Sequence, residues 1–136
     1  MLEVYSKNES VAVDTPIALN NVSLYKGISA QLQGASSIQL NKCGVYEISI
    51  SAVATAQTAG EISIQLEKNG ILQPQAFSAV TAADTTSLHP LGFTTLVQVA
   101  QNNNPNCVCS IPTIINIVNT GVAATFNSIN VTVVRV

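Results

Sequence analysis

Cysteine is the first residue type in this sequence that could do chemistry, because thiolates bind metals and form disulfides. The chain has three, at Cys43, Cys107 and Cys109. Structural zinc takes four ligands, so the Cys107–Cys109 pair of one chain is not a complete site. In a threefold assembly, three such pairs could form an axial thiol or metal cluster, and oxidation within the pair or between subunits is another alternative. We expect reduced thiols, because an odd number of cysteines argues against a fully disulfide-paired scaffold.

The single histidine, His89, could act as a general base if a carboxylate oriented it. A Ser-His-Asp arrangement needs such a carboxylate, and the nearest acid in sequence is Asp84, which lies in a polar turn. We therefore interpret His89 as a residue at the end of a strand. In a trimer, a ring of His89 or Asp84 side chains on the axis is an alternative that could hold an ion. The sequence predicts no catalytic residue.

Paired carboxylates are the next candidates, and Glu61 and Glu67 share one face of a predicted strand. Six residues of extended chain separate them by about 20 Å. The carboxylates of glycosidases stand about 5–10 Å apart, so this pair is too widely spaced. The sequence also lacks nucleotide-binding glycine loops, the H-E-x-x-H zinc motif and a calcium loop. We expect no enzyme activity and no cofactor, and we interpret the acids as surface residues.

Neutral amides and hydroxyls are concentrated in two predicted loops, Thr81 to Ser87 and Gln101 to Asn106. Such groups are suited to hydrogen bonding with sugar hydroxyls or with another protein. A merely solvated loop is the simpler interpretation. If one loop recognises a partner, the candidate residues are Asn102, Asn103, Asn104 and Asn106.

The composition excludes several partners. Only 9% of the 136 residues are charged, against about 25% in ordinary domains. The formal net charge of −2 gives no field for gripping phosphates, which argues against nucleic acid as a partner. The longest nearly apolar stretch, Ile111 to Val118, is too short to span a bilayer, and no targeting segment is visible. We expect neither a nucleic-acid nor a membrane partner.

The elements that must position these residues are predicted to be strands. Val, Ile and Thr together number 41, whereas Leu, Lys, Glu, Arg and Met number 21. β-branched residues pack well on a pleated sheet and lose rotamer freedom in a helix, so an all-β domain is favoured. Turn signals every 8–12 residues indicate a sandwich or barrel of eight to ten antiparallel strands in a single domain, 1–136. Residues 1–16 are interpreted as an N-terminal arm or edge strand, ended by Thr15–Pro16.

The clearest strand is Val45 to Thr55, in which Tyr46, Ile48 and Ile50 alternate with polar residues. In the next strand, Ile62, Ile64 and Leu66 are predicted to face inward, with Ser63 and its polar neighbours facing outward. Asn69–Gly70 then predicts a tight hairpin, because both residues tolerate positive φ. Further strands are predicted over Ile17 to Leu24, Ile28 to Leu32, Ala35 to Leu40, Pro74 to Val80, Leu91 to Val99, Ile111 to Asn119 and Ala124 to Val136.

The order of these segments resembles the jelly roll of the tumour necrosis factor and complement globular-head superfamily. The similarity runs from Ile38 through Gly44-x-Tyr46, the Asn69–Gly70 hairpin and Leu96 to Val99, and ends in the closing strand Phe126 to Val136. It covers roughly residues 20 to 136. The chain is similar to the Asn-rich, weakly charged versions in bacterial collagen-like surface proteins and in bacteriophage virion proteins.

The resemblance implies a homotrimer in which jelly rolls pack edge to face around a threefold axis. Several predicted strands carry apolar residues on both faces, and a sandwich exposed on its outer faces does not need the second row. Packing between copies would cover it, and loops of the same chain are the alternative. The residues of this second row are Val45, Val53, Leu96, Ile114, Val118, Val134 and Val136.

We therefore expect a non-enzymatic trimeric module of a bacteriophage virion, such as a head decoration or fibre knob. Its expected partners are itself, capsid or fibre proteins, and a host cell-surface glycan. The leading alternative is the C-terminal trimerisation domain of a collagen-like protein on a bacterial cell or spore surface, such as the exosporium. A lectin-like carbohydrate-binding domain or a carbohydrate-active enzyme is a further alternative, and loss of activity on changing Glu47 or Asp84 would favour the enzyme.

Overall fold

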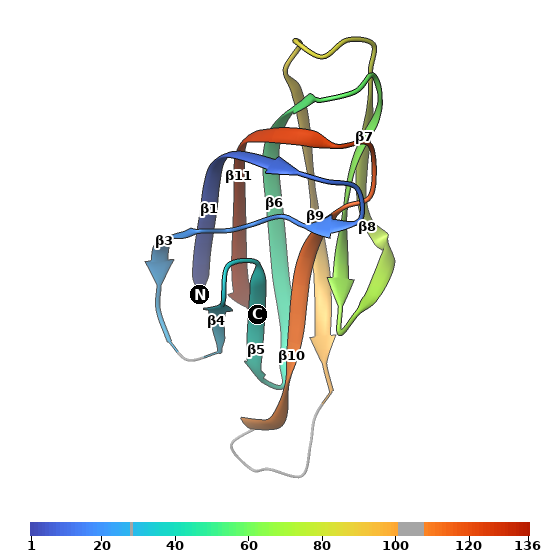
Figure 1. Cartoon of the computed structure of the whole chain (residues 1–136). Coiled ribbons are helices and arrows are strands. Elements are labelled where there is room, and N and C mark those ends of the chain that lie inside the picture. The colour runs from blue at the N-terminus through green and yellow to red at the C-terminus, as the bar shows by residue number, and fades with distance from the viewer. Residues whose placement is uncertain (28, 101–107) are drawn as a thin grey trace.

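The computed structural model describes residues 1–27, 29–100 and 108–136, with side chains from residue 112 onward in the last range. These residues form eleven strands and no helix, as the β-branched composition predicts (Figure 1). The strands are β1 (Leu2–Val11), β2 (Thr15–Pro16), β3 (Asn21–Tyr25), β4 (Ala30–Gln33), β5 (Ser37–Lys42), β6 (Gly44–Ala56), β7 (Gly60–Lys68), β8 (Ile71–Ala82), β9 (His89–Val99), β10 (Val108–Asn119) and β11 (Ala124–Arg135).

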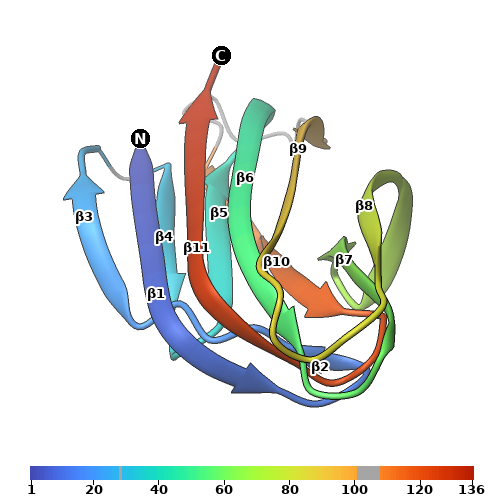
Figure 2. The same ribbon diagram turned by 90° about the horizontal axis from the view of Figure 1, so that it is seen from above.

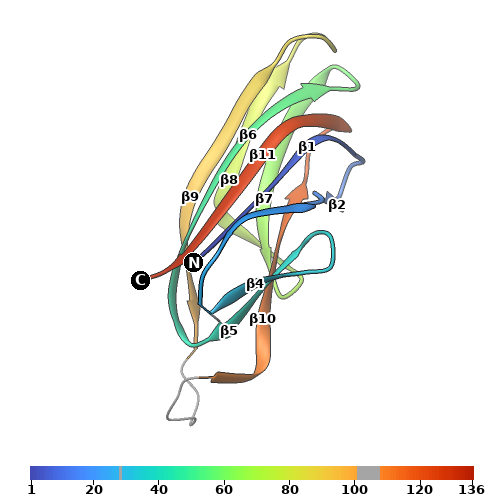
Figure 3. The same cartoon turned by 90° about the vertical axis from the view of Figure 1, so that its left-hand side faces the viewer.

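The strands form two antiparallel sheets. The five-stranded sheet has the order β3-β1-β11-β6-β9, and the six-stranded sheet has the order β4-β5-β10-β7-β8, with β2 paired to β10. Figures 2 and 3 show the sheets as two layers, with β1, β11 and β6 in one and β4, β5 and β10 in the other. This is the predicted jelly-roll sandwich. We call the end where β5 ends and β6 begins the lower end, and the opposite end the upper end.

Alternation along the strands builds the core between the two layers. In β6, Tyr46, Ile48 and Ile50 are buried, while Glu47 and Ser51 are exposed on the outward face. Strand β11 lies at the centre of its sheet and contributes a fully buried row to the same core. That row and its neighbours on the other strands form one cluster, which includes Val4, Leu40, Ile64, Ile117, Phe126, Ile129 and Val131.

The β7–β8 hairpin turns at Asn69–Gly70, as predicted. Both residues have positive φ, 51° at Asn69 and 84° at Gly70, which is the conformation that this type of tight turn requires. The strand that follows is longer than the ragged segment expected from the sequence. It runs from Ile71 to Ala82, and its register against β7 shifts between Gln65 and Glu67.

The N-terminal segment differs from the expected edge strand. Strand β1 pairs with β11 on one side and with β3 on the other, so it lies inside the five-stranded sheet. Strand β1 ends at Val11, before the predicted break at Thr15–Pro16. Pro16 itself belongs to β2 and pairs with Val118 of β10. Proline is tolerated at the margin of a sheet, because there its lack of an amide proton removes no hydrogen bond between strands.

A buried polar anchor closes the upper end. Asn119 is completely buried, and its Nδ2 donates to the carbonyls of Val11 (3.2 Å), Ala12 (3.4 Å) and Val122 (3.1 Å). Its Oδ1 accepts the amide proton of Gly121 (3.1 Å). One side chain therefore ties the end of β1 to the turn between β10 and β11, and it satisfies backbone groups that burial would otherwise leave unpaired.

Candidate interaction surface

Cys43 differs from the sequence expectation. Its side chain is buried and disulfide-bonded, so the prediction of reduced thiols is wrong for this residue. The sequence has two other cysteines, Cys107 and Cys109, and both lie outside the residues whose side chains the structure describes. The predicted thiol or metal cluster on Cys107 and Cys109 therefore remains a prediction.

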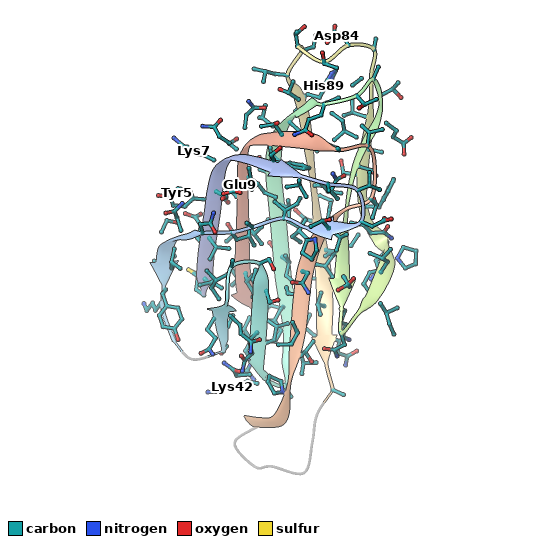
Figure 4. The ribbon with its side chains drawn as sticks, in the orientation of Figure 1. Tyr5, Lys7, Glu9, Lys42, Asp84 and His89 are labelled. Carbon is teal, nitrogen blue, oxygen red and sulfur yellow. The ribbon has the colours of Figure 1, made fainter. Side chains whose placement is uncertain are left out.

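His89 and Asp84 lie close to one another at the upper end, at the start of β9 and in the turn before it (Figure 4). The Asp84 carboxylate accepts hydrogen bonds from the amides of Ser87 (2.9 Å) and Thr86 (3.1 Å) and from the Ser87 hydroxyl (3.0 Å). These bonds, led by that of the Ser87 amide, lower the pKa of Asp84, and the nearby His89 adds to the effect.

This cluster lacks the geometry of a Ser-His-Asp triad. In a triad the serine hydroxyl donates to the imidazole, whereas here the Ser87 hydroxyl donates to Asp84. The Nε2 atom of His89 is buried without a hydrogen-bond partner among the described residues. The cluster therefore serves to hold the turn before β9, and the interpretation of His89 as a strand-end residue is confirmed.

The acidic residues do not converge either. Glu61 pairs with Thr81 at the upper end of β8, and Glu67 pairs with Leu72 near its lower end. Among the described residues, no group of three or more His, Cys, Asp or Glu side chains could hold a metal ion. None of the described residues forms a helix long and apolar enough to cross a membrane.

The predicted recognition residues, Asn102, Asn103, Asn104 and Asn106, lie outside the described residues. Their role in binding a sugar or a protein therefore stays a prediction. The described residues instead draw attention to a different surface, the outward face of the five-stranded sheet and the edges beside it.

The outward face of the five-stranded sheet is built from small uncharged side chains. Ser49 of β6 lies between Thr132 of β11 and Thr94 of β9. The hydroxyl oxygens of Ser49 and Thr94 are 3.1 Å apart. One step along, Asn130 lies beside Ser51 and Ser51 beside Gly92. On the strands β11, β6 and β9, the charged residue on this face is Glu47. The centre of the face is therefore lined by small side chains and is almost neutral.

Strand β1 borders this face with Glu3, whose carboxylate is already hydrogen-bonded. The Ser23 hydroxyl donates to Oε1 of Glu3 at 2.5 Å, and Thr132 contacts the other carboxylate oxygen at 3.4 Å. The bond from Ser23 is the largest cause and lowers the pKa of Glu3. Burial opposes it, and hydrogen bonds with Asn130 and Thr132 add smaller effects in the same direction as Ser23. Tyr5 and Lys7 follow along the same strand (Figure 4).

Exposed apolar side chains gather at two opposite edges of the sandwich. We call the first the β3 edge, where every residue of the strand is exposed. The second is the β8–β9 edge, formed by the margins of the two sheets (Figure 2). The β3 edge comprises Met1, Val22, Leu24 and Tyr25, and the β8–β9 edge comprises Ile71, Leu72, Phe77 and Leu96.

The second apolar row predicted from the sequence is only partly exposed. Val118 is buried, and it is paired with Pro16 of β2, so the chain itself covers it. Val45, Val53 and Val134 are half-buried on the outward face of the five-stranded sheet, and Ile114 is half-buried on the other sheet. Leu96 and Val136 remain largely exposed, at 61% and 70%. The part of the row that needs a cover therefore lies on the lower half of the five-stranded sheet.

Comparison with known proteins identifies the fold. No protein-family model and no curated protein matches the sequence. Among solved structures, the PRD1 vertex protein P5 has a TM-score of 0.61 at 17% identity, over 99% of this chain and 95% of that chain. Eiger TNF from S. frugiperda has a TM-score of 0.70 at 12% identity, over 99% and 92%. The globular domain of zebrafish complement 1qA has 0.60 at 8%, over 96% and 92%.

Identities this low show a likeness of fold alone, and that likeness extends over nearly the whole chain. The predicted resemblance is confirmed at this level, because TNF-like and complement globular domains both match. The chain is an all-β protein with the jelly-roll fold shared by the TNF-like and complement globular-head domains and by vertex protein P5.

Proposed function

We propose that this chain is a non-enzymatic structural module that assembles as a homotrimer. The observation that carries the proposal is the division of its exposed apolar residues between two opposite edges, the β3 edge and the β8–β9 edge. A dimer with twofold symmetry uses one patch on both copies, whereas two different patches make head-to-tail contacts, which give a ring when the rotation between copies closes and a filament when it does not. The trimer implied by the family resemblance is a ring of this kind.

In the proposed ring, the β8–β9 edge of each copy packs on the outward face of the five-stranded sheet of the next copy, and the β3 edge forms the far margin of that face. The outward face of that sheet suits close packing, because its central residues are small and uncharged. Leu96 lies where the face meets the edge, and it is 61% exposed in the isolated chain. Covering Leu96 and its apolar neighbours is favourable by the hydrophobic effect, which supplies the driving force for association.

Light scattering coupled to size-exclusion chromatography tests the trimer. The expected mass is three times the 14.2 kDa of the chain. Leu96→Asp places a charge in the contact and is expected to shift the protein to monomers. Val13→Asp is the matched control, because Val13 is 50% exposed but follows β1 at the upper end, outside both edges. A wild-type monomer, or a Leu96→Asp trimer as stable as the wild type, contradicts the proposal.

We further propose that the trimer belongs to a bacteriophage virion, as a head decoration or fibre knob. The support is the match to vertex protein P5 of PRD1, a phage protein, over almost the full length of both chains. Gold-labelled antibodies against the chain are expected to bind purified phage particles of the source strain. Labelling of the bacterial cell or spore surface in place of particles would favour the alternative role as a trimerisation domain of a surface protein.

A further inference from the structure

Glu47 lies in an unusual place for a carboxylate. Across the outward face of the five-stranded sheet, its direct neighbours are Val134 of β11 and Leu96 of β9. The next outward residue of its own strand toward the lower end is Val45. The carboxylate therefore projects from an apolar surface, and no described residue of the same chain forms a hydrogen bond or ion pair with it.

Association of the kind proposed above would remove this carboxylate from water. A charge that is covered without a partner opposes association, because desolvation is not offset by a new interaction. Among the residues that β6, β9 and β11 place on the outward face, Glu47 is the one with a charged side chain. The neighbouring copy must therefore bring one cation to one defined point of the interface.

The β8–β9 edge contains one candidate for this cation. Lys68 is the only lysine or arginine of the sequence between Lys42 and Arg135, so it is the only one that β7, β8 and β9 can supply. Its Nζ donates to the carbonyl of Gln98 at 2.7 Å, which holds the ammonium group against the margin of β9. The adjacent Glu67 does not neutralise it, because successive residues of a strand point to opposite faces.

Lys68 is also at the right height. Gln98, whose carbonyl binds the ammonium, pairs with Val45, and Val45 is two residues from Glu47 on the same face. Two residues of a strand correspond to about 7 Å along its axis, which is within the reach of a lysine side chain that swings from its carbonyl partner. When the copies in a ring are related by rotation about an axis along the strands, a residue on the face of one copy meets edge residues of the next copy at the same position along that axis.

We propose that Glu47 of one copy forms an intersubunit ion pair with Lys68 of the next. This ion pair rests on the trimer proposed above, and it determines which part of the β8–β9 edge packs on which part of the neighbouring five-stranded sheet. One anion on the face and one cation on the edge permit a single axial register between copies. Electrostatic complementarity thus gives specificity to a contact that apolar burial drives.

A charge swap tests this pair. Glu47→Lys and Lys68→Glu are each expected to weaken trimer association by about tenfold or more, because each places like charges in contact. The double variant Glu47→Lys with Lys68→Glu is expected to recover association to within about threefold of the wild type. Glu67→Lys is the control, since it changes charge by the same amount one residue away. Glu47→Gln, which is almost isosteric, is expected to weaken association less and to reduce its salt dependence.

Sedimentation equilibrium at low and high salt supplies the readout, with circular dichroism to verify that each variant is folded. A wild-type trimer with single variants that associate normally overturns the ion pair and leaves the trimer standing. A double variant as weak as the two single variants combined also overturns it. A wild-type monomer overturns the trimer itself, and with it the basis of this contact.

Discussion

The buried amide of Asn119 offers the sharpest test of how this fold is held together. Asn119→Ala removes the side chain that binds the carbonyls of Val11, Ala12 and Val122 and the amide of Gly121. Each buried backbone group that loses its only side-chain partner costs about 1 kcal/mol or more. With three or four groups affected, the free energy of unfolding is expected to fall by about 3 kcal/mol.

The assay is equilibrium urea unfolding followed by far-ultraviolet circular dichroism, because the chain has no tryptophan. All variants are compared at one chain concentration, since association contributes to the apparent stability. Asn116→Ala is the matched control on the same strand. Asn116 is half-buried, and its partners, the Ser37 hydroxyl at 2.8 Å and Glu67 at 3.5 Å, are side chains that can turn to water.

Asn116→Ala is expected to cost less than about 1 kcal/mol. The reasoning is refuted if Asn119→Ala and Asn116→Ala lower the free energy of unfolding by the same amount. Such a result would mean that the upper end relaxes and hydrates the freed carbonyls, so that the buried amide is not what closes the sandwich there.

Further tests concern the glycine of the β10–β11 turn, the carboxylate of Glu3 and the disulfide of Cys43. Gly121→Ala is expected to lower the melting temperature, because a Cβ there would lie 2.3 Å from the carbonyl oxygen of Glu61. Gly34→Ala is expected to lower it less, because a Cβ there meets nothing and the positive φ of 65° is the one source of strain. Because the pKa of Glu3 is lowered from its ordinary value of 4.5, the ionised carboxylate stabilises the fold at pH values above 4.5. This stability is lost as the pH falls through the pKa of the folded state. Glu3→Gln is expected to flatten that part of a curve of melting temperature against pH. A reductant should lower the melting temperature by breaking the Cys43 disulfide, and unchanged melting would contradict a stabilising role.

Local patterns predicted the parts of the fold that depend on one strand or one turn. The alternation from Tyr46 to Ala54 predicted β6 within one or two residues, and Asn69–Gly70 predicted the β7–β8 hairpin. These features are encoded in residues that are neighbours in sequence, because side-chain direction has period two and a tight turn needs specific φ angles.

Pairings between distant segments could not be predicted in the same way. The burial of Ser63, which the alternation of β7 placed outside, follows from the turn after β10, whose Thr120 hydroxyl lies 2.7 Å from Ser63 Oγ. The internal place of β1 depends on partners more than a hundred residues away. The anchoring role of Asn119 was missed for the same reason, although an asparagine that ends an apolar strand beside Thr-Gly is a signal that could have drawn attention to it.

For the candidate surface, the sequence located single residues but not their grouping. It placed Leu96 and Val134 in a second apolar row, and the structure shows that Glu47 lies between them. The sequence did not predict that Lys68 lies at the margin of β9. The contact between Lys68 and Gln98 joins strands of different sheets, and the two residues are 30 positions apart in sequence.

The pairing of β1 with β11 also has a mechanical consequence. Leu2 lies opposite Val133, so Met1 and Val136 leave the same end of two adjacent antiparallel strands. A force that pulls these two residues apart would break the β1–β11 hydrogen bonds one after another, as a zipper opens, at low load. A force between the upper end and either terminal residue would act along the strands and strain many hydrogen bonds at once. The domain is therefore expected to be weak when pulled between its termini and strong when attached by its lower end and loaded at its upper end.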